Sequence, residues 1–227
     1  MPTRRCSRDL IHRLQQTRRQ LPGAQIVVVE PETAEPRSRP TNRRVSRLAD
    51  HILLVTAPLG RGTQCNGGAR AATGDLLLFL HDDTSLPETA ASVIERAFRD
   101  PDTQIACFRL AFDHSHWLLR LYAGFSAFDS LVTSFGDQGI LIRRALFERI
   151  GGFPDWPLFE DVELLRNARR NTRVVKLPAR VTTSAVRFVE GGMIRQQLLN
   201  TELIVRFVLG ADPQALWHRY ERRRPDC

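Results

Sequence analysis

The stretch of sequence that decides the fold is Gly74-Asp75-Leu76-Leu77-Leu78-Phe79-Leu80-His81-Asp82-Asp83-Thr84. An apolar run over 76–80 is followed directly by two adjacent carboxylates and soon after by Pro87. This pattern predicts a buried parallel strand that ends in a loop. In open α/β sheets, ligands bind beyond the carboxyl ends of the strands, so the two acids stand where a divalent cation and a diphosphate could meet. The stretch therefore predicts a nucleotide site.

Strand-like and helix-like segments alternate around this run. Apolar residues at helical spacing predict helices over 7–21, 42–49, 88–99, 117–131, 144–149 and 161–170. Apolar and β-branched runs predict strands over 26–29, 52–55, 76–80, 105–112, 139–142 and 174–177. Prolines over 30–40 and glycines over 60–68 predict loops, the second followed by a helical turn over 69–72. The alternation predicts an α/β fold with three layers and a mostly parallel sheet.

We expect the 227 residues to form a single domain. Its nucleotide half would span about 7–100 and its acceptor half about 101–190, followed by a C-terminal amphipathic helix at about 193–220. This last segment is rich in Leu, Ile, Val and Phe and is interrupted by Arg195 and Arg206. Packing on the core is the plainer interpretation, and contact with a membrane surface is the alternative.

The chain is basic, with a formal net charge of +8, and Lys176 is its only lysine among 33 basic residues. Guanidinium groups suit phosphates, which fits a nucleotide-sugar, an anionic lipid or a nucleic acid. The arginines are scattered through every expected element and stand beside no recognised nucleic-acid motif. No specific nucleic-acid partner is therefore expected.

The cysteines and the first residues bear on the compartment. Four cysteines lie far apart without C-x-x-C spacing, which favours unpaired thiols in a reducing compartment: Cys6, Cys65, Cys107 and Cys227. Residues 6–20 lack the apolar core of a signal peptide, and no segment approaches the length of a membrane span. We expect a cytoplasmic protein, with the inner face of the membrane as a contact if the C-terminal helix lies on lipid.

Three clusters carry candidate chemistry, and each has a plainer explanation. His81-Asp82-Asp83 offers oxygen ligands for Mg²⁺, although aspartates after a strand also serve turns and helix caps. Residues 60–68 offer glycine backbone and Arg61 to an anion, but they lack the order of a P-loop and an ordinary connection explains them equally well. Residues 159–163 hold acids that either complement a helix dipole or include a general base.

Two weaker signals complete the set. The turn over 136–139 either shapes an acceptor pocket or merely starts a strand. His114 and His116 receive no metal role, because no further ligands stand at suitable spacing.

Together these residues resemble glycosyltransferase family 2, whose members have the GT-A fold, a Rossmann-like sheet that binds a nucleotide-sugar and usually Mg²⁺ or Mn²⁺. The resemblance covers about residues 7–220. It is closest to a small bacterial subgroup described as radical-SAM/selenodomain-associated transferases, sometimes labelled carotenoid-acid glycosyltransferases. The motifs that carry it occur in one order: Gly60-Arg61 with Gln64 and Asn66, Ala72-Thr73-Gly74-Asp75, Leu78-Phe79-Leu80-His81-Asp82-Asp83-Thr84, Gly136-Asp137-Gln138-Gly139, Gly151-Gly152-Phe153-Pro154 and Glu160-Asp161-Val162-Glu163.

The resemblance implies an inverting, metal-assisted transfer of a sugar to an acceptor hydroxyl or carboxyl. Asp83 would bind Mg²⁺ or Mn²⁺, and Asp82 would support the metal or the ribose. Asp161 would be the catalytic base, with Glu160 beside it in the catalytic pair. The remaining roles implied are nucleotide-sugar contacts from Glu30, Arg61, Gln64, Asn66 and Arg187, and acceptor contacts from Asp137 and Gln138. A lipid-linked or carotenoid-like acceptor is implied by analogy and by the apolar C-terminal segment.

The chain departs from the family in three places. Members usually begin with an apolar strand that ends in Pro and Asn-Glu, and no such strand stands before Cys6. Their next strand leads into an acidic loop that holds the base, whereas this chain has Glu30-Pro31-Glu32-Thr33-Ala34-Glu35. His81 replaces the first acid of Asp-x-Asp. These departures leave two alternatives open, namely a GT-A-shaped binding or partner protein that has lost catalysis, and a truncated gene model.

Overall fold

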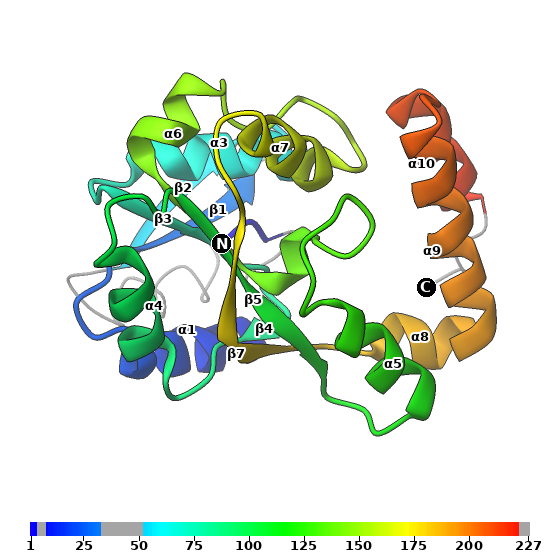
Figure 1. Ribbon diagram of the computed structural model, residues 1–227, viewed down its shortest axis with the longest axis horizontal. Coiled ribbons are helices and arrows are strands. Elements are labelled where there is room, and N and C mark those ends of the chain that lie inside the picture. Colours follow the sequence, from blue (N-terminus) through cyan, green and yellow to red (C-terminus); the bar gives the residue numbers. More distant parts are fainter. Residues whose placement is uncertain (4–7, 33–51, 223–227) are drawn as a thin grey trace.

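Two sheets form the centre of the molecule (Figure 1). The smaller sheet pairs β1 (Ile26–Pro31) with β2 (Ile52–Ala57) in parallel. The larger sheet has the order β3-β6-β5-β7-β4, with β3 at Leu76–Phe79, β4 at Thr84–Ser85, β5 at Ile105–Phe112, β6 at Ile140–Arg143 and β7 at Val175–Thr183. The computed structural model describes residues 1–3, 8–32 and 52–222, and all structural statements concern these residues.

The strands of the larger sheet run in both directions. β5 and β7 are parallel, while β6 is antiparallel to both β3 and β5, and β4 is antiparallel to β7. The chain leaves β5, passes through α5 (Trp117–Phe125) and enters β6 from the end at which β5 finished. The α/β class is confirmed, but the sheet is partly rather than mostly parallel.

Helices cover both faces of the larger sheet because successive side chains of its strands point to opposite sides. Ile105 and Cys107 of β5 pack with α3 (Arg61–Ala71), α6 (Arg144–Arg149) and α7 (Glu160–Arg169). Phe108 and Leu110 of the same strand pack with α4 (Ala90–Phe98) and α5 on the other face. Figure 1 shows α3, α6 and α7 above the strands and α4 below them. This is the three-layer arrangement that the alternation of elements predicts.

The first and last helices extend this core. α1 (Arg8–Gln20) buries Leu10 and Leu14 against β1. After β7 come α8 (Val186–Gly191), α9 (Met193–Val208) and α10 (Pro213–Glu221), and α9 packs Leu199, Leu203 and Phe207 against Val162 of α7. The interpretation of the C-terminal segment as a packed helix is confirmed. In the described part of the chain, no helix has both the length and the apolar character needed to cross a bilayer.

The expected loop over 60–68 is wrong, because α3 begins at Arg61. Its glycines serve close packing: a Cβ on Gly62 would lie 2.4 Å from the carbonyl oxygen of Pro154, and one on Gly68 would lie 3.0 Å from Val29 Cγ2. Glycine is a poor helix former, so its low propensity indicated a loop. The tertiary contacts of the helix with β1 and with the turn before α7 outweigh that propensity.

Other boundaries differ by less. The helix expected over 117–131 ends at Phe125, where the Ser126 hydroxyl turns back to the carbonyl oxygen of Ala123 at 2.5 Å. β7 continues to Thr183 because it pairs with both β5 and β4. Cys65 and Cys107 are buried free thiols, as expected, whereas Cys6, Cys227 and the helix expected over 42–49 lie outside the described residues.

The place of the first strand is partly taken by Met1–Thr3. Pro2 forms a parallel bridge with Val29, and Thr3 N–H donates to Val29 O at 3.0 Å. The bridge is isolated, so β1 and β3 stay in separate sheets.

Candidate active site

The acidic turn after β3 is held between two strands. Leu80 is buried beyond the end of β3, and His81, Asp82 and Asp83 form the turn that leads into β4. The Thr84 hydroxyl lies 3.3 Å from Asp83 Oδ1 and 3.2 Å from the hydroxyl of Thr183 in β7. β4 thus fixes the turn to the opposite edge of the larger sheet, and the carboxylates stand beyond the carboxyl end of β3 as the sequence predicts.

Gly136 joins this turn to the start of α7. It opens the short 3-10 helix η1 (Gly136–Gln138), and its N–H donates to Asp161 Oδ2 at 2.5 Å. A Cβ on Gly136 would lie 2.9 Å from Asp161 Oδ2 and 3.0 Å from His81 Nε2. Asp161 Oδ1 also accepts from the N–H of Val162 at 2.8 Å. Three segments that are far apart in sequence therefore meet at one backbone position.

Arg61 and Glu160 form the next contact of the site. Arg61 Nε lies 3.5 Å from Glu160 Oε1, and the glutamate side chain is only 2% exposed. Burial and the neighbouring Asp161 raise the pKa of Glu160 to about 7, and the positive charge of Arg61 partly opposes this rise. The first residue of α3 is thereby tied to the first residue of α7.

Asp137 completes a group of four carboxylates that we call the acidic cluster: Asp83, Asp137, Glu160 and Asp161. Burial, followed by the charges of Asp161 and Asp83, raises the pKa of Asp137 to about 7. Its Oδ1 is buried without a hydrogen-bond partner among the described residues. The cluster therefore concentrates negative charge that the surrounding protein only partly balances.

Two basic residues and one histidine face the same region. Burial, and then the charges of Arg61 and Arg187, lower the pKa of His81 well below its usual value. The imidazole is therefore neutral at neutral pH and does not add to the positive charge of the two arginines. Arg187 itself is exposed in α8.

The backbone before the carboxylates of α7 is unusual. Phe159 caps the helix with φ 63°, in the left-handed region that non-glycine residues seldom adopt. Its ring packs against Phe207 of α9, with 4.8 Å between ring centroids. Such positions cluster at functional sites, where the surrounding structure holds them. Here the contact between α7 and α9 holds the turn that presents Glu160 and Asp161.

Two amides expected to contact the nucleotide are used inside the protein. Gln64 is buried, and its amide nitrogen donates to the carbonyl oxygens of Thr3 and Val29 at 3.0 and 2.8 Å. Asn66 donates to the carbonyl oxygen of Phe153 at 2.9 Å and accepts from its N–H at 3.0 Å. Both amide groups thus have backbone partners in the structure, and their contacts with a nucleotide stay a prediction.

Gln138 also has partners inside the protein. It is 1% exposed, its amide nitrogen donates to the carbonyl oxygen of Thr133 at 2.6 Å, and its Oε1 accepts from Lys176 Nζ at 2.6 Å. Each end of the side chain thus has one protein partner, and the contact of Gln138 with an acceptor stays a prediction. Asp137, its neighbour in η1, is the other residue expected to contact the acceptor.

The remaining expected residues lie at the edges of the site. Glu30 is the last residue but one of β1 and lies beside Thr56 of β2, and Asp82 is half-buried in the turn after β3. Sequence reasoning missed Tyr122 of α5, whose pKa is raised well above its usual value by burial and then by Asp137 and Asp161. No motif marks this tyrosine, because its helix lies outside the segments that carry the resemblance.

The acidic cluster suits a hard divalent cation without enclosing one. Among the residues described, no three His, Cys, Asp or Glu side chains form a ready-made metal site. Mg²⁺ is usually held by one or two carboxylates together with substrate phosphates, and carboxylate oxygens also suit Mn²⁺. The unpaired Asp137 Oδ1 and the accumulated negative charge fit a cation that arrives with a diphosphate.

The fold has counterparts among solved structures. A mannosyltransferase of Pyrobaculum calidifontis, in complex with GDP-Man and Mn²⁺, matches 96% of this chain with a TM-score of 0.61 at 18% identity. S. aureus TarS matches 93% with the same TM-score and identity, and TarS in complex with UDP-GlcNAc matches 81% with a TM-score of 0.58 at 16% identity. The chain spans 66% of the mannosyltransferase and 64% of the first TarS structure.

At these identities the likeness shows the fold, a Rossmann-like α/β architecture shared with these proteins. No known family profile and no curated protein sequence matches the chain.

Proposed function

We propose that the protein is an inverting glycosyltransferase that moves a sugar from a nucleotide-sugar to an acceptor hydroxyl or carboxyl. The observation that carries the proposal is the acidic cluster, in which the turn after β3 and the start of α7 meet around Gly136. The cluster occurs in a fold shared with a mannosyltransferase solved with GDP-Man and Mn²⁺. Positive charge from arginine would bind the donor diphosphate, and a carboxylate would take the proton of the attacking group. The region of the acidic cluster contains both kinds of charge.

The donor would lie between the acidic turn and the two arginines. Arg61 and Arg187 supply positive charge for the diphosphate, while Asp82 and Glu30 remain candidates for the ribose and the base. Asp83 would hold Mg²⁺ or Mn²⁺, and Asp137, whose pKa is raised in part by the charge of Asp83, would be a second carboxylate ligand. When bound, the metal neutralises the charge that develops on the departing nucleoside diphosphate.

Asp161 is the proposed catalytic base. Its two oxygens accept from the N–H groups of Gly136 and Val162, which fixes the plane of the carboxylate. One lone pair of a carboxylate oxygen remains available to take the proton of the acceptor while that oxygen attacks the anomeric carbon. A single displacement from the face opposite the leaving group inverts the anomeric centre. Glu160, ion-paired with Arg61, supports the arrangement.

The acceptor side is proposed to be apolar and close to lipid. Ile194 and Leu198 are each 65% exposed along α9, and Trp117 is 61% exposed on α5. Exposed apolar surface of this extent is typical of membrane or partner contacts, and Arg195 adds positive charge beside it. We propose peripheral contact with the cytoplasmic membrane face and a lipid-linked or carotenoid-like acceptor.

The experiment measures Mn²⁺-dependent hydrolysis or transfer from a panel of UDP- and GDP-sugars. We expect Asp83→Ala and Asp161→Asn each to lower kcat by at least about a hundredfold, as is usual for loss of a charge-stabilising group or a general base. Asp75→Ala is the matched control, because Asp75 is an exposed carboxylate at the opposite end of the same strand. Equal activity in the wild type and both site variants would reject the assigned roles.

Calorimetry distinguishes the alternative of a GT-A-shaped binding protein without catalysis. If UDP or GDP binds with Mn²⁺ but no donor is turned over, the fold has kept the nucleotide site and lost the reaction. If a folded protein binds no nucleotide at all, the donor site itself is absent, and a partner-binding role is favoured.

A further inference from the structure

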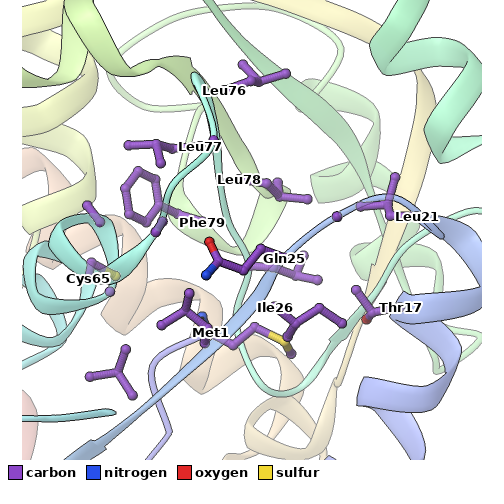
Figure 2. Close-up of a pocket in the computed structure, with 18 of the residues that line it drawn as sticks. Met1, Thr17, Leu21, Gln25, Ile26, Cys65, Leu76, Leu77, Leu78 and Phe79 are labelled. Carbon is purple, nitrogen blue, oxygen red and sulfur yellow. The ribbon is translucent and has the colours of Figure 1, made fainter. Parts of the chain in front are cut away.

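A cavity of about 350 Å³ lies between β1 and β3 (Figure 2). Figure 2 shows the side chains of Leu77 and Phe79 along one side of it, with Met1 and Ile26 across from them. Its lining residues, all in the described part of the chain, include no member of the acidic cluster. Because the reacting oxygen of an acceptor must reach Asp161, this cavity is not where an acceptor would react. The side chains that approach the acidic cluster from α5 are the candidates for contact with an acceptor.

Tyr122 of α5 is held in place by two phenylalanine rings. Its ring centroid lies 5.8 Å from that of Phe112, at the end of β5, and 6.4 Å from that of Phe188 in α8. The two phenylalanine rings pack edge to face, with 5.5 Å between their centroids. Figure 1 shows α5 beside α8, and Leu119 of α5 joins Phe188 in one buried cluster. Contacts with β5 and α8 thus fix the position of the tyrosine ring.

The hydroxyl of Tyr122 lies within reach of the charges of Asp137 and Asp161. Burial and then these two negative charges raise the pKa of Tyr122 well above its usual value. The phenol therefore keeps its proton at neutral pH and can donate one hydrogen bond. The hydroxyl makes no hydrogen bond to another residue that the structure describes, and its oxygen is not sealed in the core. Its proton is thus free for a ligand that enters beside the acidic cluster.

An apolar stripe lies on the exposed side of α5, next to Tyr122. Trp117, Leu121 and Phe125 recur at intervals of four residues, and each is more than half exposed. Phe125 follows Tyr122 by three residues, so the two side chains are neighbours on the surface of the helix. The helix therefore presents apolar surface directly beside one polar group.

We propose that Tyr122 binds the acceptor and that the apolar stripe of α5 receives the hydrocarbon chain of the same molecule. This role rests on the proposed glycosyl transfer, in which Asp161 is the base. The oxygen of an acceptor hydroxyl carries one proton and two lone pairs. The proton goes to Asp161, one lone pair attacks the anomeric carbon, and the second lone pair accepts a hydrogen bond from the Tyr122 hydroxyl. These contacts fix the direction in which the oxygen attacks.

The charges around Tyr122 favour an alcohol over a carboxylic acid as the acceptor. A carboxylate brought to this place would be repelled by the negative charges of Asp137 and Asp161. An ionised carboxylate also has no proton for a general base to remove. The acceptor class is therefore an alcohol attached to an apolar chain.

The kinetic test compares Tyr122→Phe with Tyr220→Phe. Each variant removes one hydroxyl, and Tyr220, in α10, is the only other tyrosine of the chain. Transfer from UDP- and GDP-sugars to added 1-octanol is measured with Mn²⁺. We expect Tyr122→Phe to lower the rate of transfer by about two- to tenfold, the usual contribution of one hydrogen bond, and to leave the KM for the donor and the Tm unchanged.

The outcomes of the kinetic test separate this role from the proposed function. Equal rates of transfer in the two variants would overturn the role of Tyr122. A wild type that hydrolyses the donor and transfers nothing to 1-octanol would overturn the alcohol as acceptor class. A wild type that turns over no donor would reject the proposed function itself.

A binding test needs no turnover. In Tyr220→Phe protein that carries tyrosine labelled with carbon-13 at Cζ, Tyr122 gives the only tyrosine signal. With Mg²⁺ and UDP or GDP present, we expect 1-octanol to shift this signal saturably and octanoate, at the same concentration, to shift it less. A signal that ignores 1-octanol, or that responds equally to octanoate, would overturn the proposal. Either result leaves the donor site and Asp161 untouched.

Discussion

Gly136 holds the acidic turn and α7 together through the absence of a side chain. Replacing it by alanine would put a Cβ 2.9 Å from Asp161 Oδ2 and 3.0 Å from His81 Nε2. One of these groups must move, and displacing a catalytic carboxylate by a fraction of an ångström costs about tenfold or more in rate. We therefore expect Gly136→Ala to lower transferase activity by at least about tenfold, with a Tm drop of about 2–8 °C, as measured by initial rates and thermal melting.

Gly124→Ala is the control for this substitution. Gly124 lies in α5, and a Cβ there would meet nothing within 4 Å. Alanine in a helix is favoured over glycine by about 0.5–1 kcal/mol, so this variant should keep its activity and gain stability. If Gly136→Ala behaved in the same way, the geometry around Asp161 would not limit the reaction.

The stability of the protein should depend on pH through Asp137. Because its folded-state pKa is about 7 and that of an unfolded aspartate is about 3.9, the native state keeps a proton that the unfolded chain loses between about pH 4 and 7. The free energy of unfolding therefore falls as pH rises through this window, by up to about 1.4 kcal/mol per pH unit for each such proton.

Asp137→Asn should weaken this pH dependence and make the protein more stable than the wild type at about pH 8, as measured by denaturant unfolding without divalent ions. Part of the slope will remain, because burial and Asp161 also raise the pKa of Glu160 to about 7. A variant with the full wild-type slope would show that Asp137 is not the group that retains the proton. Asp102→Asn, at an exposed position, is the matched control.

At the scale of the elements, α3 depends on glycine to approach its neighbours. A Cβ on Gly62 would lie 2.4 Å from the carbonyl oxygen of Pro154, which is backbone and cannot swing aside. We expect Gly62→Ala to destabilise the fold by about 2–3 kcal/mol in denaturant unfolding. Gly23→Ala is the control, because nothing lies within 4 Å of its added Cβ. Equal stability of the two variants would mean that α3 can shift away from the turn before α7.

The exposed stripe of α9 allows a test of membrane contact. Ile194 and Leu198 point away from the core that Leu199 and Leu203 join. If α9 rests on lipid, Ile194→Glu with Leu198→Glu should reduce co-sedimentation with vesicles containing anionic lipid by at least about tenfold, without lowering Tm. Thr201→Glu, also exposed on α9, adds charge without removing apolar surface. Binding that responds equally to both variants would indicate charge attraction alone.

Across the whole molecule, helices and strands were predicted best from the sequence where the pattern of apolar residues alone determines them. The strand over 105–112 and the helix over 144–149 were predicted with their observed bounds, because their apolar residues fit one period without interruption. α3 was missed because its glycines have meaning only against β1 and Pro154. The antiparallel direction of β6 was missed because the apolar pattern of a buried strand does not record direction.

Some features of the candidate site could be predicted from the sequence and others could not. The resemblance named Asp83, Glu160 and Asp161 as site residues, and the structure brings these three carboxylates into one region. The partners of the amides inside the protein could not be predicted, because a glutamine or asparagine looks the same in sequence whether it faces a ligand or the backbone. Gln138 is the clearest case, since its partners, Thr133 and Lys176, come from different parts of the chain.

The position of Lys176 in β7 has a practical consequence. Because Lys176 is the only lysine, a lysine-specific endoprotease has one site in the chain, before Leu177. Leu177 is fully buried in β7, whose neighbour β5 lies at the centre of the larger sheet. Cleavage of the bond between Lys176 and Leu177 requires the central strands to separate. It yields two fragments that differ in size and can be resolved on a gel. The rate of cleavage at this single site therefore reports global unfolding of the protein. Local fraying at the periphery does not expose the site.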